Sequence, residues 1–152
     1  MVLVELDQLV QALTGSNDRY AYACLKELLA QSENSDAVFA YFGRFAPMIS
    51  AQNSYQRTRG LLLIAANAQW DTEGKVQELL PEYLRHITDE KPITARQCIK
   101  ALPQLVAGQP ALAPAVLQAL QTAKPQYADS MQGLVQRDIA AAAKAIAALG
   151  SV

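Results

Sequence analysis

The chain has 152 residues, of which 51% are hydrophobic and 18% are charged, and its formal net charge is −1. A chain of this length can bury a core without disulfide bonds or metal ions. The composition excludes a disordered tail and a protein that binds polyanions through bulk charge, because both need far more charge than this chain carries.

The N-terminal residues and the cysteines indicate where the protein works. Residues 1–10 carry Glu5 and Asp7 without a basic leading segment, so they do not resemble a signal peptide, and no apolar run reaches the roughly 20 residues of a membrane span. Cys24 and Cys98 are far apart in the sequence, and each falls on an apolar helical stripe, which fits neither a disulfide framework nor a metal motif. We expect a cytoplasmic protein with buried, reduced thiols and no membrane partner.

Apolar residues at steps of three and four predict amphipathic helices from the start of the chain. The first helix is expected over residues 2–13, with a left-handed cap at Gly15. The second is expected over residues 18–31, after a cap at Asn17 or Asp18.

The third helix is expected as one element over residues 35–49, interrupted in its last turns by Pro47. Its aromatic residues have helical spacing, which favours an ordinary core over a ligand site: Phe39, Tyr41, Phe42 and Phe45. The fourth helix, over 54–69, is apolar all round at 61–66. Such a helix lies in the middle of its structure, with neighbours on several sides.

The second half of the chain repeats this pattern. A fifth helix should follow a cap at Asp71 or Thr72 and end before the polar turn at 88–92. Three more helices are expected over 92–107, ended by Gly108, over 110–120, and over 129–149. No sustained period-two alternation occurs, so the sequence predicts no β-strand and an all-α fold.

The predicted helices form repeats. The even-numbered helices align through Arg19, Arg59, Arg96 and Gln132, and prolines recur in the odd-numbered helices at Pro47, Pro81 and Pro114. A two-helix period of about 40 residues is typical of an α-solenoid.

The repeat resembles the HEAT family most closely over residues 79–107. Leu80 and Pro81 match the leucine-proline pair of the family's first helix, Asp89 matches its turn aspartate, and Arg96 matches the arginine that opens its second helix. The resemblance implies one domain of about eight helices in antiparallel pairs, with units 1–31, 35–69, 73–108 and 110–149. It also implies that Asp89 pairs with the turn or with Arg96.

A fainter resemblance covers the run DEKPITARQCIKALPQL, at 89–105. It is similar to small bacterial HEAT-like proteins labelled as relatives of the SufBD iron-sulfur assembly components. Iron-sulfur assembly would require exposed cysteine, histidine or carboxylate ligands. The two cysteines are expected to be buried, so this label gives little support to a role in iron-sulfur assembly.

The sequence offers no constellation for catalysis, a cofactor or a metal. His86 is the only histidine, and its place beside the turn at the end of the fifth helix favours a solvated side chain over a catalytic base. Glu78 and Glu82 are expected to be solvated on an outward face, and the glycines never cluster into a phosphate-binding loop. We therefore expect no enzyme.

A basic, amide-bearing ridge along the even-numbered helices is the candidate binding surface. In a HEAT-like stack these helices line the concave face. The expected members are Tyr22, Lys26, Arg59, Leu63, Asn67, Arg96, Lys100, Gln104 and Arg137. The sequence leaves open whether the arginines bind a partner or pair with turn aspartates.

The ridge predicts a non-catalytic module that binds another protein or an acidic peptide. One alternative is a HEAT-like DNA-binding or DNA-repair protein. Nucleic acid is the weaker partner, because the chain is slightly acidic and its only tryptophan, Trp70, falls at a helix end. Two further alternatives are a self-associating structural protein, which would form a homo-oligomer, and an accessory to iron-sulfur assembly.

Overall fold

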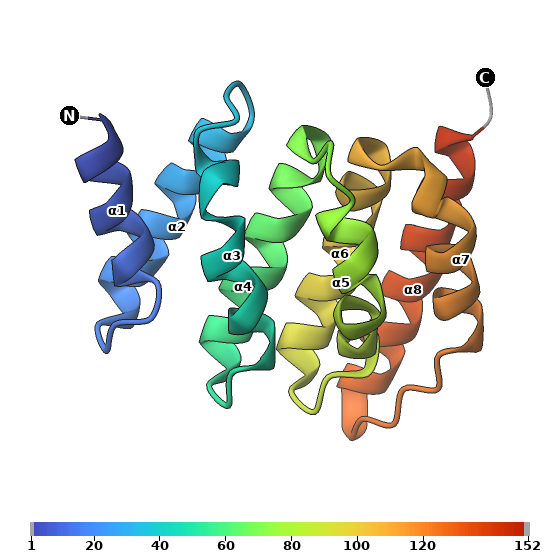
Figure 1. The fold of residues 1–152 in the computed structure, drawn as a ribbon. Helices are drawn as coiled ribbons and strands as arrows, with labels where there is room; N and C mark the ends of the chain where they lie inside the picture. Colours follow the sequence, from blue (N-terminus) through green and yellow to red (C-terminus); the bar gives the residue numbers. More distant parts are fainter. Residues whose placement is uncertain (1, 151–152) are drawn as a thin grey trace.

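The computed structural model describes residues 2–150, with side chains from Glu5 onward. All regular structure in this range is helical, and no β-strand occurs within it (Figure 1). The prediction of an all-α fold is therefore confirmed for the described part of the chain.

Eight α-helices occur in the described residues: α1 Val2–Ala12, α2 Asp18–Ser32, α3 Phe42–Phe45, α4 Ser54–Asn67, α5 Lys75–Leu84, α6 Pro92–Gly108, α7 Ala113–Thr122 and α8 Asp129–Leu149. Five 3-10 helices connect or extend them: η1 Val38–Tyr41, η2 Ala46–Ser50, η3 Ala68–Trp70, η4 Arg85–Thr88 and η5 Pro110–Leu112. The expected bounds of the last helix agree with those of α8.

The helices follow one another in chain order across the molecule, from α1 at one end to α7 and α8 at the other (Figure 1). The even-numbered helices form a row in which α2 packs against α4, α4 against α6, and α6 against α8. The remaining elements add to this row: α1 contacts α2, α3 and η2 contact α4, η4 contacts α6, and α7 contacts α8.

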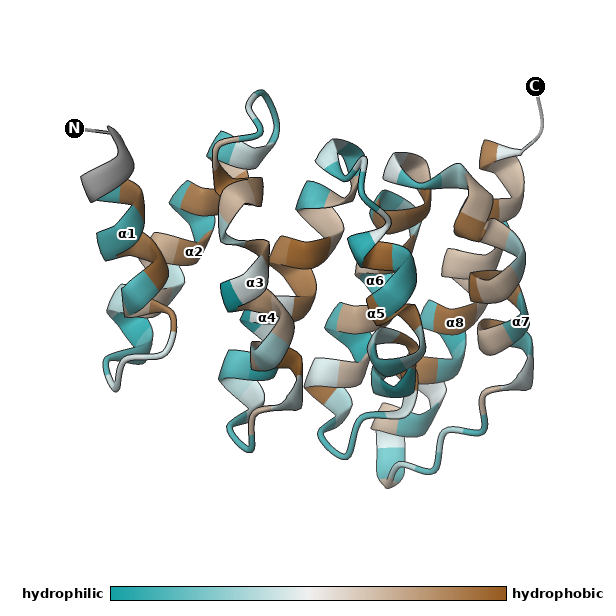
Figure 2. Ribbon diagram, in the orientation of Figure 1, coloured by the Kyte–Doolittle hydropathy of each residue, from teal (hydrophilic) through white to brown (hydrophobic). Residues whose placement is uncertain are grey.

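Helix α4 lies at the centre of the core. The side chains from Leu61 to Ala68 are buried, apart from the half-buried Leu62, and the helix contacts α2, η2 and α6. Hydrophobic residues lie where neighbouring helices face each other, whereas the connecting loops are mostly hydrophilic (Figure 2). The all-round apolar stretch therefore has the central position that the sequence predicted.

The interruption expected at Pro47 is confirmed, but the third helix is not otherwise one element. Residues 38–50 form three short pieces, η1, α3 and η2. Tyr41 leaves the α-helical region, with φ −97° and ψ 12°, and Pro47 has no N–H to continue the helical hydrogen bonds. The aromatic residues nevertheless belong to the core, as predicted: Phe42 and Phe45 are buried, and Phe39 packs against Phe42 with 5.7 Å between ring centroids.

Side-chain caps fix several helix starts. Asn17 accepts a hydrogen bond from the Tyr20 N–H at 3.0 Å and caps α2, as expected. Asp71 accepts from the Val76 N–H at 2.8 Å, but the cap position of α5 belongs to Gly74, with φ 77°. The left-handed cap expected at Gly15 is wrong, because Gly74 is the glycine with positive φ in residues 2–150.

Both cysteines are buried and free. Burial raises the pKa of the Cys98 thiol well above its ordinary value, and the negative charge of Asp89 adds to this effect. Among the described residues, no helix combines the length and the apolar character needed to cross a membrane.

Gly108 marks the closest approach between α6 and η3. A Cβ at this position would lie 2.5 Å from the backbone nitrogen of Gln69 and 2.8 Å from the carbonyl carbon of Ala68. The adjacent Gln109 side chain donates to the Ala68 and Asp71 carbonyls, both at 2.8 Å. Because the Gln69 and Ala68 atoms nearest to Gly108 belong to the backbone, they cannot rotate away from a larger side chain.

We expect Gly108→Ala to lower the free energy of unfolding by about 1 to 3 kcal/mol, the range for overpacking. Gly43→Ala is the matched control, since a Cβ there meets nothing within 4 Å. It should leave stability unchanged or raise it by up to about 1 kcal/mol. Urea unfolding of both variants tests the expectation, and a Gly108→Ala protein as stable as wild type would refute the close approach.

Candidate functional site

The structure places most of the predicted ridge on the surface but not its α4 members. Tyr22, Lys26, Lys100, Gln104 and Arg137 are exposed. Because they lie on α2, α6 and α8, the expected outward faces of these helices are correct.

On α4 the predicted register is wrong. Leu63 and Asn67 are fully buried and Arg59 is only 5% exposed, so these residues do not form an exposed ridge. The Asn67 amide instead donates to the Leu63 carbonyl at 2.9 Å. The stretch is apolar on every side, and periodicity therefore could not identify its outward face.

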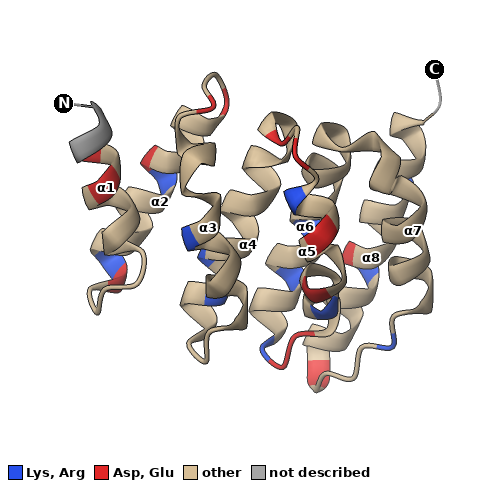
Figure 3. Cartoon of the chain, viewed as in Figure 1, with Lys and Arg blue, Asp and Glu red and all other residues tan. Residues whose placement is uncertain are grey.

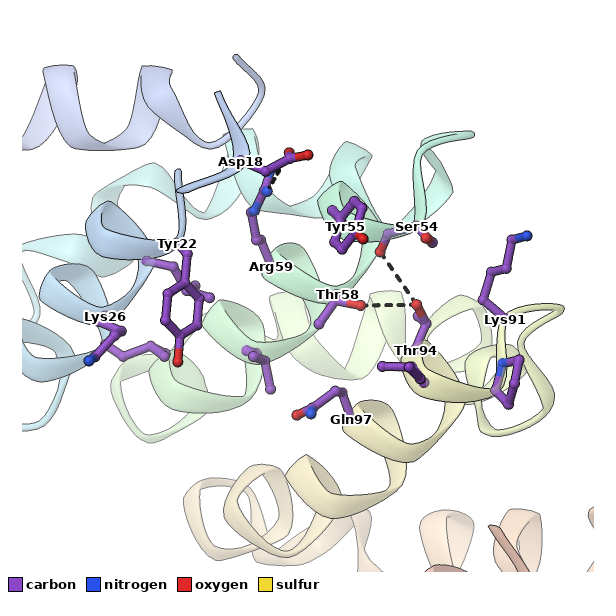
Figure 4. Close-up of a pocket in the computed structure, with 15 residues that line it drawn as sticks. Asp18, Tyr22, Lys26, Ser54, Tyr55, Thr58, Arg59, Lys91, Thr94 and Gln97 are labelled. Atoms are coloured by element: carbon purple, nitrogen blue, oxygen red, sulfur yellow. Dashed lines mark hydrogen bonds and ion pairs between the residues drawn. The ribbon is translucent and has the colours of Figure 1, made fainter. Parts of the chain in front are cut away.

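The true outward face of α4 borders a cavity of about 630 Å³ between α2, α4 and α6. Residues from all three helices line it: Asp18, Tyr22, Leu25, Lys26, Leu29, Ser54, Tyr55, Thr58, Arg59, Leu62, Lys91, Pro92, Ile93, Thr94 and Gln97 (Figure 4). Of the predicted ridge, only Tyr22, Lys26 and Arg59 belong to this set. The volume lies within the range of compact ligand sites, about 300 to 1,000 Å³.

The rim of the cavity carries large apolar side chains that remain open to solvent. Tyr22 is 59% exposed, Tyr55 62% and Ile93 67%. Ile93 stands in the first turn of α6 but outside its apolar stripe, a sequence signal that could have identified it. Tyr55 and Thr58 precede the all-apolar stretch of α4 and gave no comparable signal.

The floor of the cavity contains hydroxyl groups that bind each other. The hydroxyl oxygens of Thr58 and Thr94 are 3.0 Å apart, and Thr94 also donates to the Ser54 carbonyl at 3.4 Å (Figure 4). These bonds connect α4 with α6 at the floor of the cavity. The Gln97 side chain makes no hydrogen bond within the described residues, so its amide remains available to a ligand.

One opposite-charge pair and two lysines set the electrostatics of the cavity. Arg59 Nη2 donates to Asp18 Oδ1 at 2.9 Å and Nη1 donates to the Leu13 carbonyl at 2.8 Å. Lys26 lies 5.6 Å from the Tyr22 ring centroid, and neither Lys26 nor Lys91 has a carboxylate within 4.0 Å among the described residues. Charges of both signs are otherwise spread over the chain, although α7 carries none (Figure 3).

A second cluster surrounds Asp89, in the turn before α6. Arg57 donates two hydrogen bonds to this carboxylate, from Nε at 2.9 Å and from Nη2 at 2.7 Å. The Lys91 N–H donates to Oδ1 at 2.9 Å, and the Tyr127 hydroxyl donates to the Asp89 backbone carbonyl. The Arg57 and Asp89 side chains are only 6% and 3% exposed, so this is a buried ion pair.

His86 belongs to the same cluster, and the expectation of a solvated histidine is wrong. Its side chain is 12% exposed, and Nδ1 lies 2.7 Å from Asp89 Oδ2. Nε2 is buried and has no hydrogen-bond partner in residues 2–150. The histidine and aspartate have the geometry of two members of a catalytic triad, but no serine, threonine or cysteine binds Nε2 as the third.

The Asp89 carboxyl has a strongly shifted pKa. Burial alone would raise this pKa, but hydrogen bonds from His86, Arg57 and the Lys91 N–H to the charged form outweigh burial. The pKa therefore lies well below its usual value of 3.8. Burial also raises the pKa of Tyr127 to about 12, which keeps its hydroxyl protonated as a donor.

The resemblance implied that Asp89 pairs with the turn or with Arg96; the turn contact is confirmed by the Lys91 N–H, and the pairing with Arg96 is wrong. Arg96 Nε instead donates to Asp138 Oδ2 on α8, at 2.6 Å. Each of the three pairs therefore joins an even-numbered helix to a later element: Asp18–Arg59 joins α2 to α4, Arg57–Asp89 joins α4 to the turn before α6, and Arg96–Asp138 joins α6 to α8.

Known proteins do not identify the site. No family model, curated protein sequence or solved structure matches the chain. Within the described residues, no group of three or more His, Cys, Asp or Glu side chains is placed to hold a metal ion. The geometry of the α2–α4–α6 face is accordingly the basis for inferring a function.

A double-mutant cycle tests the buried pair. We expect Arg57→Met and Asp89→Asn each to cost about 3 to 5 kcal/mol, because either leaves a buried charge unpaired. Their coupling energy should fall between about 0.5 and 3 kcal/mol in urea unfolding. The matched cycle of Arg96→Met with Asp89→Asn should give almost none, and equal coupling in both cycles would contradict the observed pairing.

The pKa of Asp89 gives a separate prediction for acid stability. Since its folded pKa is lowered, the carboxylate stabilises the fold above the unfolded value, near pH 4, and this contribution is lost as the pH falls further. The stability difference between wild type and Asp89→Asn should therefore narrow below about pH 4. Unfolding free energies measured from neutral pH to about pH 2 check this, and a constant difference would exclude the linkage.

Proposed function

We propose that the chain is a short HEAT-like α-solenoid of antiparallel helix pairs that binds another protein, without catalysis, through the face formed by α2, α4 and α6. The consecutive packing of α2, α4, α6 and α8 supports the solenoid. Ion pairs from α2, α4 and α6 to the element that follows in this row support the same architecture, because in a solenoid each repeat contacts only its neighbours.

The apolar rim of the cavity carries the functional proposal. The described chain exposes five large hydrophobic side chains, and three of them, Tyr22, Tyr55 and Ile93, surround this one cavity. Exposed apolar groups gathered in one place are typical of an interaction site, and tyrosine is enriched among residues that dominate binding energy. A partner that covers the rim must be larger than the cavity itself, which favours a protein.

The charges of the face favour a protein over nucleic acid. Arg59 and Arg96, which could have bound phosphates, are held by Asp18 and Asp138. Binding along a nucleic-acid backbone depends on a series of free cations. The apolar walls of the cavity instead match the buried centre of a protein interface.

The triple variant Tyr22→Ala, Tyr55→Ala and Ile93→Ala should lose the partner but keep its fold, since exposed positions tolerate substitution. We expect at least about 2 kcal/mol of lost binding energy, or roughly 30-fold in Kd, if one of the three is a dominant contact. A partner captured with the wild-type chain would be titrated against each variant by calorimetry, with unfolding curves as the check on the fold.

The matched control is the double variant Tyr20→Ala and Leu149→Ala. Both side chains are exposed, at 54% and 48%, and neither lines the cavity. It should bind the partner with wild-type affinity. Unchanged affinity of the triple variant, or an equal loss in the control, would show that the α2–α4–α6 face is not the binding surface.

A further inference from the structure

We infer that the cavity receives a linear segment of the partner in which a large apolar side chain is flanked on both sides by carboxylates. This inference rests on the proposed function and specifies the chemistry of its ligand. It comes from three features of the cavity: its walls, its floor and the placement of its charges.

The walls of the cavity are apolar and fit an apolar side chain of the ligand. Leucine side chains contribute from α2 and α4, namely Leu25, Leu29 and Leu62, and α6 contributes Pro92 and Ile93. An aromatic or leucine side chain that enters this space removes apolar surface from water on both partners, at about 25 cal/mol per Å². Tyr22 and Tyr55 on the rim can cover the sides of such a group.

The floor has no charged side chain that could pair with a charged group at the tip of that side chain. The Thr58 and Thr94 hydroxyls already bind each other, and Thr94 has the Ser54 carbonyl as a further acceptor. A carboxylate pushed to this depth would lose its hydration and gain at most hydrogen bonds to neutral groups such as the Gln97 amide. The acidic groups of the partner therefore belong at the rim.

The two unpaired lysines define where those acidic groups lie. Lys26 and Lys91 stand at opposite ends of the cavity (Figure 4). The only carboxylate of the lining, Asp18, is neutralised by Arg59, so the cavity has a net positive charge within a chain of net charge −1. Acidic residues on both sides of the apolar side chain would each meet one lysine.

The carboxylates nearest in sequence do not compete for these lysines. Glu27, beside Lys26, accepts a hydrogen bond from Gln31 at 3.1 Å. Glu90, beside Lys91, lies 3.9 Å from Arg57. The ammonium groups therefore face solvent and an incoming ligand, and a segment with basic flanks would be repelled at both ends.

Selection from a library of random linear peptides on the full chain tests the inference. The target proteins are wild type, the double variant Lys26→Glu and Lys91→Glu, and the matched control Lys124→Glu and Lys144→Glu, whose lysines are exposed and lie outside the cavity. Unfolding curves establish that all three are folded. One peptide selected on wild type is then synthesised for measurements of Kd.

Wild type and control should select peptides with an aromatic or leucine residue between acidic residues. The Lys26 and Lys91 variant should select basic residues at the flanking positions and bind the wild-type peptide about tenfold more weakly, a loss of about 1.4 kcal/mol. The same peptide should bind less tightly when salt is added, because the lysines are exposed. Ile93→Ala should also weaken it, since Ile93 belongs to the apolar wall.

Three results would overturn the inference. The first is an apolar consensus without acidic flanks, the second is the same acidic consensus on the charge-reversed variant, and the third is no enriched peptide on wild type. None of these results would contradict the proposed function. The triple variant Tyr22→Ala, Tyr55→Ala and Ile93→Ala tests the proposed function separately, with the captured partner. If that variant loses the partner and the peptide selection also fails, the α2–α4–α6 face is still the interface. Only the inference of an acidic linear segment is then wrong.

Discussion

The buried pair between Arg57 and Asp89 is the interaction on which the junction between α4 and α6 depends. Its carboxylate accepts from Arg57, His86 and the Lys91 N–H, while its backbone carbonyl accepts from Tyr127. One turn residue thereby ties together α4, η4, the start of α6 and the segment that leads to α8. Because a buried charge without partners is costly, these contacts support one another and are not independent surface pairs.

Local features of the fold could be predicted from the sequence. Asn17 caps α2 through a hydrogen bond to the N–H three residues on, and the apolar spacing of α8 extends over 21 residues, so both signals are complete within one segment. The central place of α4 was also predictable, because a helix without a polar side must be covered all round.

Features that depend on contacts between distant segments could not be predicted. The outward face of α4 depends on the elements that pack against this helix. A stretch without polar residues does not indicate which side of the helix faces solvent, so Leu63 and Asn67 were predicted to be exposed although both are buried. Arg96 binds Asp138, which lies 42 residues further along the chain, because α6 packs on α8, and no local sequence pattern shows that packing. Most of the cavity lining was missed for the same reason, since it combines residues of three helices.

The position of the two arginines on α4 has a mechanical consequence for the cavity. Arg59 is held by Asp18 towards α2, and Arg57 is held by Asp89 towards α6, so the middle helix is tied to both of its neighbours from within a single turn. The opening between α2 and α6 therefore has a set width before any ligand arrives. A partner segment meets a recess that is already formed, so less of its binding energy is spent on ordering the protein around it.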